Sequence, residues 1–406
     1  MTVLEEQFDI QAFLGSELSK DLLRLATAGS VDDGKSTLIG RLLHDARGAY
    51  EDQLKSVRRA DGGIDFALLT DGLRAEREQG ITIDVAYRYF ATPKRKFILA
   101  DTPGHLQYTR NMATGASTAD LAIILVDASR GLTDQSRRHA SIAALLGIRH
   151  FVIAVNKMDL VNRDYAVFHE VFKSFKPFLD SIGVIEPYFL PMSALLGDNV
   201  VERSAKMPWF AGPPLLEHLE SIAFEKPVNS AFRMPVQRAV RPDSSFRGYA
   251  GQIASGVIRP GDEIVALPGG RRTKVERIVT FDGDLEVAHP PLSATITLAD
   301  ELDIGRGDML AAGVAPKTVR SMEATVVWFD EAPLDPAKEY LLKHTTQTVR
   351  ARVETGFIFR MNDIADARVA LAGPLFVDPY KENRTTGSFI LIDRDTNATA
   401  AAGMIK

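Results

Sequence analysis

Residues 29–36 read Gly29-Ser30-Val31-Asp32-Asp33-Gly34-Lys35-Ser36, and this stretch decides the fold of the domain around it. It fits the pattern G-x-x-x-x-G-K-[ST] and lies between an apolar run at 22–28, which predicts a strand, and a helical pattern that continues from Thr37. In that context the loop's backbone N–H groups surround a phosphate, and the start of the helix adds its positive end. A tight glycine turn before a helix is the alternative, and the strand–loop–helix order makes it the poorer explanation.

The polar groups of this loop have separate expected roles. Lys35 is expected to reach the β- and γ-phosphates of a nucleotide, and the Ser36 hydroxyl is expected to bind Mg²⁺. The whole loop and the next residue are predicted to bind nucleotide: Gly29, Ser30, Val31, Asp32, Asp33, Gly34, Lys35, Ser36 and Thr37.

Composition limits the classes of protein that this chain can be. Its 406 residues predict two to four domains, and contents of 45% hydrophobic and 25% charged residues are typical of a soluble globular protein. The net charge of −5 argues against a main role in binding nucleic acid, although a local basic patch stays open. The absence of cysteine excludes disulfides, thiolate metal sites and a cysteine nucleophile, which suits the cytoplasm. We find no signal peptide and no run of ~18 apolar residues, so no membrane partner is expected.

The first part of the chain, residues 1–225, alternates apolar strands with helical patterns. This alternation predicts an α/β domain with a mostly parallel sheet and helices on both faces. In such a sheet the ligand lies at the carboxyl ends of the strands, where the polar motifs of this chain occur. The expected strands are Leu22–Ala28, Val85–Phe90, Lys96–Ala100, Leu121–Asp127, His150–Asn156 and Tyr188–Pro191.

The third of these strands ends in Asp101-Thr102-Pro103-Gly104-His105. An acid in this place suits a Walker-B aspartate, so Asp101 is expected to hold Mg²⁺ through water. Gly104 is expected to donate its N–H to a γ-phosphate and to move when that phosphate leaves, which makes a switch. Alone, a Pro-Gly turn after a strand explains these residues as well, and the phosphate loop upstream favours the switch.

Two further residues complete the expected catalytic set of Lys35, Thr82, Gly104 and His105. Thr82 lies in the segment 76–84, where it can offer its hydroxyl to Mg²⁺ and its N–H to the phosphate. His105 is the candidate for orienting a water against the γ-phosphate, and a solvent-facing turn residue is the simpler alternative. The histidines show no H-x-x-x-H or H-E-x-x-H spacing, so a zinc site is not expected.

The base is predicted from Asn156-Lys157-Met158-Asp159, which follows a buried strand. Asp159 can accept from both N1–H and the exocyclic amine of guanine, whereas adenine would place an acceptor against the carboxylate. Asn156 is expected to fix the loop, and Lys157 to lay its stem along the nucleotide. The segment Ser193-Ala194-Leu195 follows another apolar strand, and the Ala194 N–H is expected to reach guanine O6.

From residue 226 the pattern changes to short strands punctuated by turns. It predicts two small antiparallel β-barrel domains, residues 226–315 and 316–406. Neither contains a convincing catalytic group, because His344 and Asp393 are better explained as polar strand residues.

Four signatures, Gly29–Ser36, Gly80–Asp84, Asp101–His105 and Asn156–Asp159, resemble the translational GTPases of the elongation factor Tu group. The phosphate loop, with Ser30 and Asp33 where translation factors usually have histidines, is most similar to the large subunits of bacterial sulfate adenylyltransferases. Three further stretches extend this resemblance over nearly the whole chain: Asp65–Leu73, Gln107–Ser117 and Thr386–Arg394.

The resemblance implies a GTP-hydrolysing, energy-coupling subunit with GTP/GDP and Mg²⁺ as cofactors. Its implied partner is a small catalytic subunit, at which ATP and sulfate act to give adenylylsulfate and pyrophosphate. An adenylylsulfate kinase, fused or separate, belongs to some relatives, and these residues contain no second phosphate loop for it. The alternative is an elongation-factor-type GTPase carrying aminoacyl-tRNA, against which the acidic balance and the Ser30/Asp33 loop count.

The chain departs from the family in three places. Leu106 stands where a glutamate is expected, which bears on the switch surface. The segments 55–65 and 360–365 are shorter than the family suggests, so residues are either deleted or omitted from the numbering there.

Overall fold

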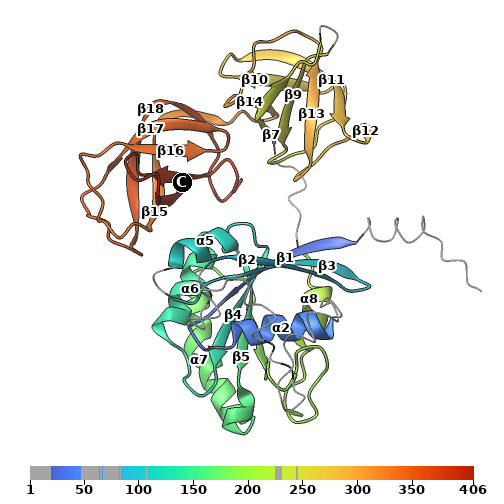
Figure 1. The fold of residues 1–406 in the computed structure, drawn as a ribbon, viewed down its shortest axis with the longest axis vertical. Helices are drawn as coiled ribbons and strands as arrows, with labels where there is room; N and C mark the ends of the chain where they lie inside the picture. Colours follow the sequence, from blue (N-terminus) through green and yellow to red (C-terminus); the bar gives the residue numbers. More distant parts are fainter. Residues whose placement is uncertain are drawn as a thin grey trace, which may run out of the picture. The chain divides into compact units, whose positions relative to one another are not determined.

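The computed structural model describes residues 20–46, 64, 66, 82, 84–105, 108–224, 231–243 and 246–406. The chain divides into two compact units, Met1–Ala223 and Phe224–Lys406 (Figure 1). Within the described ranges, no helix combines the length and the apolar character that crossing a membrane requires.

The first unit contains one six-stranded sheet with the order β2-β3-β1-β4-β5-β6. All neighbouring strands are parallel except β2, which pairs antiparallel with β3 at the edge. The strands are β1 (Asp21–Ala28), β2 (Ala86–Ala91), β3 (Arg95–Asp101), β4 (Leu121–Asp127), β5 (His150–Asn156) and β6 (Tyr188–Pro191). The mostly parallel sheet predicted from the sequence is confirmed.

Helices cover both faces of this sheet. Figure 1 shows α2 and α8 on one side of it and α5, α6 and α7 on the other. Because both faces are covered, β4 is buried at every residue, which is why its sequence is a continuous apolar run. Within the described residues of this unit the α-helices are α2 (Lys35–Asp45), α5 (Thr109–Ala116), α6 (Asp134–Leu145), α7 (Tyr165–Ser181) and α8 (Leu215–Ser221), and a 3₁₀ turn covers Met158–Val161.

The second unit begins with an antiparallel sheet in the order β7-β14-β10-β11-β13-β9-β8, with β12 paired to β11. Its interior is apolar, with Tyr249, Ile264 and Ile296 each about 1% exposed or less. The strands are β7 (Phe232–Pro235), β8 (Arg238–Val240), β9 (Gly248–Gln252), β10 (Glu263–Leu267), β11 (Arg271–Thr280), β12 (Gly283–Asp284), β13 (Ser293–Leu298) and β14 (Met309–Ala312).

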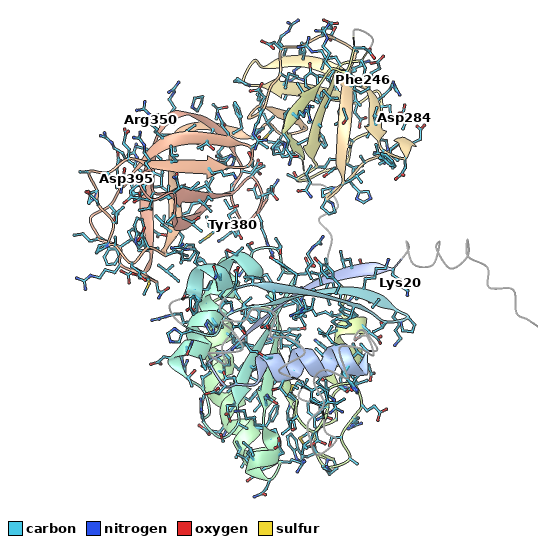
Figure 2. All side chains as sticks on the ribbon, viewed as in Figure 1. Lys20, Phe246, Asp284, Arg350, Tyr380 and Asp395 are labelled. Atoms are coloured by element: carbon cyan, nitrogen blue, oxygen red, sulfur yellow. The ribbon has the colours of Figure 1, made fainter. Side chains whose placement is uncertain are left out.

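The remaining strands form a closed barrel in the order β15-β18-β17-β16-β19-β20. Trp328, Leu342 and Val369 fill its interior, while Arg350 and Asp395 lie exposed on its outside (Figure 2). The strands are β15 (Lys317–Trp328), β16 (Tyr340–His344), β17 (Gln347–Glu354), β18 (Ile364–Val377), β19 (Ser388–Ile392) and β20 (Thr399–Ile405). An α/β domain followed by antiparallel β structure is therefore the observed fold class, as predicted.

A buried ion pair joins the antiparallel sheet to the barrel within the second unit. Arg233 of β7 donates from Nε and Nη2 to the two carboxylate oxygens of Asp378, at 3.0 and 2.9 Å. Thr386 Oγ1 donates to the same carboxylate at 2.6 Å, and His344 Nε2 contacts the Thr386 carbonyl at 2.8 Å. His344 thus serves this packing, and Asp393 pairs with Lys338 at 2.6 Å.

Candidate nucleotide-binding site

The phosphate loop is built around the Lys35 ammonium. Lys35 Nζ donates to the carbonyls of Gly29 and Ser30, both at 2.9 Å. An ammonium group has three N–H donors, and within the described part of the chain two of them are used, which leaves the third for a ligand. Gly34 caps α2 with a left-handed φ of 92°, and a Cβ there would lie 2.4 Å from Asn156 Nδ2, so the position requires glycine.

Charges near the loop shift the pKa values of its ionisable groups. Burial lowers the pKa of Lys35, and the carboxylates of Asp101 and Asp33 oppose that effect. Burial raises the pKa of Asp33, although its hydrogen bond from the Ser30 N–H and the charge of Lys35 act the other way. That hydrogen bond, to Asp33 Oδ2, measures 2.6 Å.

The segment 101–105 lies against this loop. Asp101 ends β3 opposite Thr27 of β1 and is 2% exposed. A Cβ on Gly104 would lie 2.4 Å from Lys35 Nζ and 2.7 Å from the Gly29 carbonyl, so the Gly104 backbone passes directly over the phosphate loop. His105 follows at half-buried exposure with its ring 6.0 Å from that of Tyr108.

Asn156 joins the phosphate loop to the loop after β6. Its Nδ2 donates to the Asp33 carbonyl at 2.8 Å, and its Oδ1 accepts from the Ala194 N–H at 2.9 Å. Ser193 is fully buried and its hydroxyl accepts from the Leu196 N–H, whereas Leu195 is 51% exposed. Because Ala194 donates to Asn156 here, its expected contact with guanine O6 stays a prediction.

The other predicted residues lie at the same edge of the sheet or outside the described residues. Asp159 is half-buried in the turn Met158–Val161, and Ser36 and Thr37 are half-buried at the start of α2. In the phosphate loop, Val31 is half-buried and Asp32 is exposed. Thr82 is half-buried, but most of its segment 76–84, like Leu106 and most of 55–65, lies outside the described residues.

Residues 127–133, the last residue of β4 and the segment that leads to α6, also contribute to the site and were not predicted from the sequence motifs. Asp127 Oδ2 accepts from Lys157 Nζ at 2.8 Å, and the Ser30 hydroxyl lies 3.0 Å from that of Thr133. Arg130 lies 3.8 Å from the Asp32 carboxylate. An acid at the end of an apolar strand was the available signal, because Asp127 ends β4 as Asp101 ends β3.

A phosphate loop tied through Asn156 to an N-K-x-D loop, at the carboxyl edge of a parallel sheet, defines the class of phosphate-loop GTPases. Residues 20–226 match the elongation factor Tu GTP binding domain, and residues 358–406 match the GTP-eEF1A C-terminal domain-like family. The nucleotide of this site is therefore GTP or GDP.

Two relatives narrow this class. Sulfate adenylyltransferase subunit 1 of Bacteroides fragilis is 51% identical, over 99% of this chain and 89% of that protein. The bifunctional enzyme CysN/CysC of Rhodopirellula baltica is 52% identical over 98% of this chain, which spans 65% of that longer protein. The chain belongs to the sulfate adenylyltransferase subunit 1 family of elongation factor Tu-like GTPases.

Proposed function

We propose that this chain is the GTP-hydrolysing subunit of a sulfate adenylyltransferase and that its hydrolysis drives adenylylsulfate formation by a smaller partner subunit. The observation that carries the proposal is the pairing of Ser30 with Asp33 and with Thr133. These contacts are made by the two loop residues at which this family differs from translation factors. The proposal also places the chain in the cytoplasm, at the first step of sulfate assimilation.

The hydrolysis needs binding groups at one end of the nucleotide and a positioned water at the other. Lys35 and the loop N–H groups hold the phosphates, and Asp159 accepts from guanine. His105 orients the water whose oxygen attacks the γ-phosphorus. The bond from the γ-phosphorus to the β–γ bridging oxygen breaks, GDP keeps the electron pair, and both water protons end on the released phosphate.

The residues near the phosphates fit Mg²⁺. The Ser36 and Thr82 hydroxyls and the Asp101 carboxylate are oxygen groups, the ligands that Mg²⁺ prefers. The Asp101 charge acts on Lys35, which places that carboxylate near the phosphate loop. When bound, Mg²⁺ neutralises charge on the phosphates. Ser36, Thr82 and Asp101 would hold it.

Coupling to the partner requires surfaces that differ between the GTP and GDP states. Thr82 and Gly104 are the residues whose N–H groups would bind the γ-phosphate, so their segments are the ones that change on hydrolysis. We place the GTPase domain at residues 1–225 and two β domains at 226–315 and 316–406. ATP and sulfate act at the small subunit, and an adenylylsulfate kinase, fused or separate, would use its product.

The test is GTP turnover by the purified chain, alone and with the small subunit, ATP and sulfate. We expect turnover to rise only when all three are added, with adenylylsulfate formed in proportion to GTP consumed. The Ser30→Ala variant should bind GTP and respond less. Turnover that ignores these additions but rises with ribosomes and aminoacyl-tRNA would favour the elongation-factor alternative instead.

A further inference from the structure

Asp127 is a buried carboxylate with every oxygen engaged, at the end of β4. It is 2% exposed. Its Oδ2 accepts from Lys157 Nζ at 2.8 Å, and its Oδ1 accepts from the N–H and hydroxyl of Ser129 at 2.8 and 2.6 Å. Burial alone would raise the pKa of Asp127, but the hydrogen bonds from Lys157 and Ser129 outweigh it and hold the pKa below its usual value. The group is therefore a stable anion beside the base-binding loop.

Lys157 is the partner that connects this anion to the nucleotide. It lies between Asn156, which is bound to the phosphate loop, and Asp159, which is expected to read guanine. Its backbone is left-handed, with φ 62°. Residues other than glycine adopt this conformation uncommonly, and here the surrounding structure must hold it. Fixing its ammonium on Asp127 fixes the direction of the four-carbon stem, which carries much conformational entropy when free.

The Asp127 charge also reaches the phosphate loop. It contributes to the raised pKa of Asp33, so the two carboxylates lie within electrostatic range of each other. Arg130 Nε lies 4.0 Å from Asp127 and its Nη2 lies 3.8 Å from Asp32. A carboxylate near the phosphate loop would repel the phosphates of a bound nucleotide unless cations neutralised it, and Lys157 and Arg130 supply that charge.

We propose that Asp127 is a positioning residue for the guanine nucleotide, holding the Lys157 side chain in place as one wall of the pocket. The proposal rests on the guanine-nucleotide binding that the proposed function includes. Its consequence is that the ion pair slows nucleotide release. GDP dissociation is measured on the chain without the small subunit, so this proposal and the coupling of hydrolysis to adenylylsulfate can fail separately.

A role confined to the loop is the competing explanation, because Asp127 also binds Ser129. Asp127→Asn keeps the size of the side chain and an oxygen for Ser129 but removes the charge that binds Lys157. Ser129→Ala removes the hydroxyl that donates to Asp127 but keeps the charge that binds Lys157. If Asp127 positions Lys157, Asp127→Asn should speed GDP dissociation and Ser129→Ala should not. If Asp127 only holds its own loop, Ser129→Ala should speed GDP dissociation and Asp127→Asn should not.

The experiment is a double-mutant cycle on the dissociation rate of a fluorescent GDP from the full chain. Loss of one partner of a buried charge pair acts mainly on the dissociation rate. Because Lys157 is 27% exposed and solvent weakens the pair, we expect Asp127→Asn to speed GDP dissociation only about tenfold. Lys157→Met should give a similar increase, and the double variant should add no more than about twofold to either. The control Asp180→Asn breaks an exposed Lys176–Asp180 pair of 2.8 Å and should leave the rate unchanged.

Three results would overturn the proposal: a rate for Asp127→Asn within about twofold of the parent, full multiplication of the two single effects, or acceleration by Ser129→Ala alone. If Asp127→Asn does not fold, the comparison of Lys157→Arg with Lys157→Met tests the proposal instead. That variant keeps a cation for Asp127 and should release GDP more slowly than Lys157→Met. Equal rates for the two Lys157 variants would show that the pair does not matter.

Discussion

The Asp33 carboxylate accepts a hydrogen bond from the backbone N–H of Ser30 at 2.6 Å, so two of the four residues that the phosphate-loop pattern leaves open are bound to each other. The Ser30 hydroxyl then contacts that of Thr133, the N-cap of α6, at 3.0 Å. The phosphate loop is thereby tied to α6 through side chains. Histidines at both positions, as in translation factors, would remove the Asp33 carboxylate and the Ser30 hydroxyl that make these two contacts.

Two variants of Asp33 separate its hydrogen bond from its charge. Asp33→Ala frees the Ser30 N–H and should weaken GDP binding about tenfold, since hydrogen bonds to charged groups contribute ~1.5 kcal/mol or more. Asp33→Asn keeps an acceptor and removes a negative charge beside the phosphates, so its GDP affinity should equal or exceed that of the parent. Titration calorimetry measures both. Equal weakening by the two variants would mean that the charge, not the acceptor, is what the loop needs.

The sheet of the first unit was predictable because buried parallel strands are continuous apolar runs. The predicted limits of β4, β5 and β6 were correct. Those of β1 differed by one residue at one end, and those of β2 and β3 by one residue at each end. In the second unit the strands are less evident from the sequence, and β20 is an example. β20 consists largely of small residues, and its Gly403 leaves room for the Phe389 ring, a tertiary fit that no local pattern shows. Residues 232–240 form two strands rather than one, because β7 pairs with β14 and β8 with β9.

The site was predictable to the extent that sequence motifs carry it. Lys35 and Asn156 were found because their patterns are local. The Asp127–Lys157 pair was not, because it depends on β4 and β5 lying in register with Asp127 opposite Asn156. The pairing of β15 with β18 could not be predicted either. Residues 371–374 of β18 lie opposite the single residue Arg320 of β15, and no local sequence pattern indicates this bulge.

Asp159→Asn should exchange guanine for xanthine as the preferred base. The amide oxygen can accept from N1–H and the amide nitrogen can donate to the xanthine O2, whereas guanine would place its exocyclic amine, a donor, against that donating nitrogen. We expect the GTP affinity to fall about 100-fold and the xanthosine triphosphate affinity to rise. Competition between the two nucleotides measures the change, and a variant that keeps its GTP affinity would show that Asp159 does not read the base.

His105→Ala should slow GTP hydrolysis while leaving nucleotide binding intact. Positioned side chains that handle the attacking water contribute about 100-fold or more to such rates. Single-turnover hydrolysis gives the rate, and GDP affinity on the same sample gives the binding. Loss of both in equal measure would point to a structural role for His105 at its contact with Tyr108.

His139 should make the first unit less stable in mild acid. It is 2% exposed in α6, and its Nδ1 has no hydrogen-bond partner within the described part of the chain. Burial, helped by the charges of Lys35 and Arg138, lowers its pKa from 6.5 to about 3. Between these values the unfolded chain binds one more proton than the folded one, so the stability is complete above pH 6.5 and falls as the pH falls.

For one such group, the free energy of unfolding should drop by about 1.4 kcal/mol between pH 7.5 and 5.5. The chain has two tryptophans, so in a Trp328→Phe background Trp209 reports denaturant unfolding of the first unit alone. Leucine does not titrate, so in His139→Leu the free energy of unfolding should fall less over this interval, by the amount that His139 contributes. This comparison holds whatever the stability of the variant at pH 7.5. An identical pH dependence in both proteins would mean that His139 takes up its proton as readily in the folded state as in the unfolded one, despite its burial and the charge of Lys35.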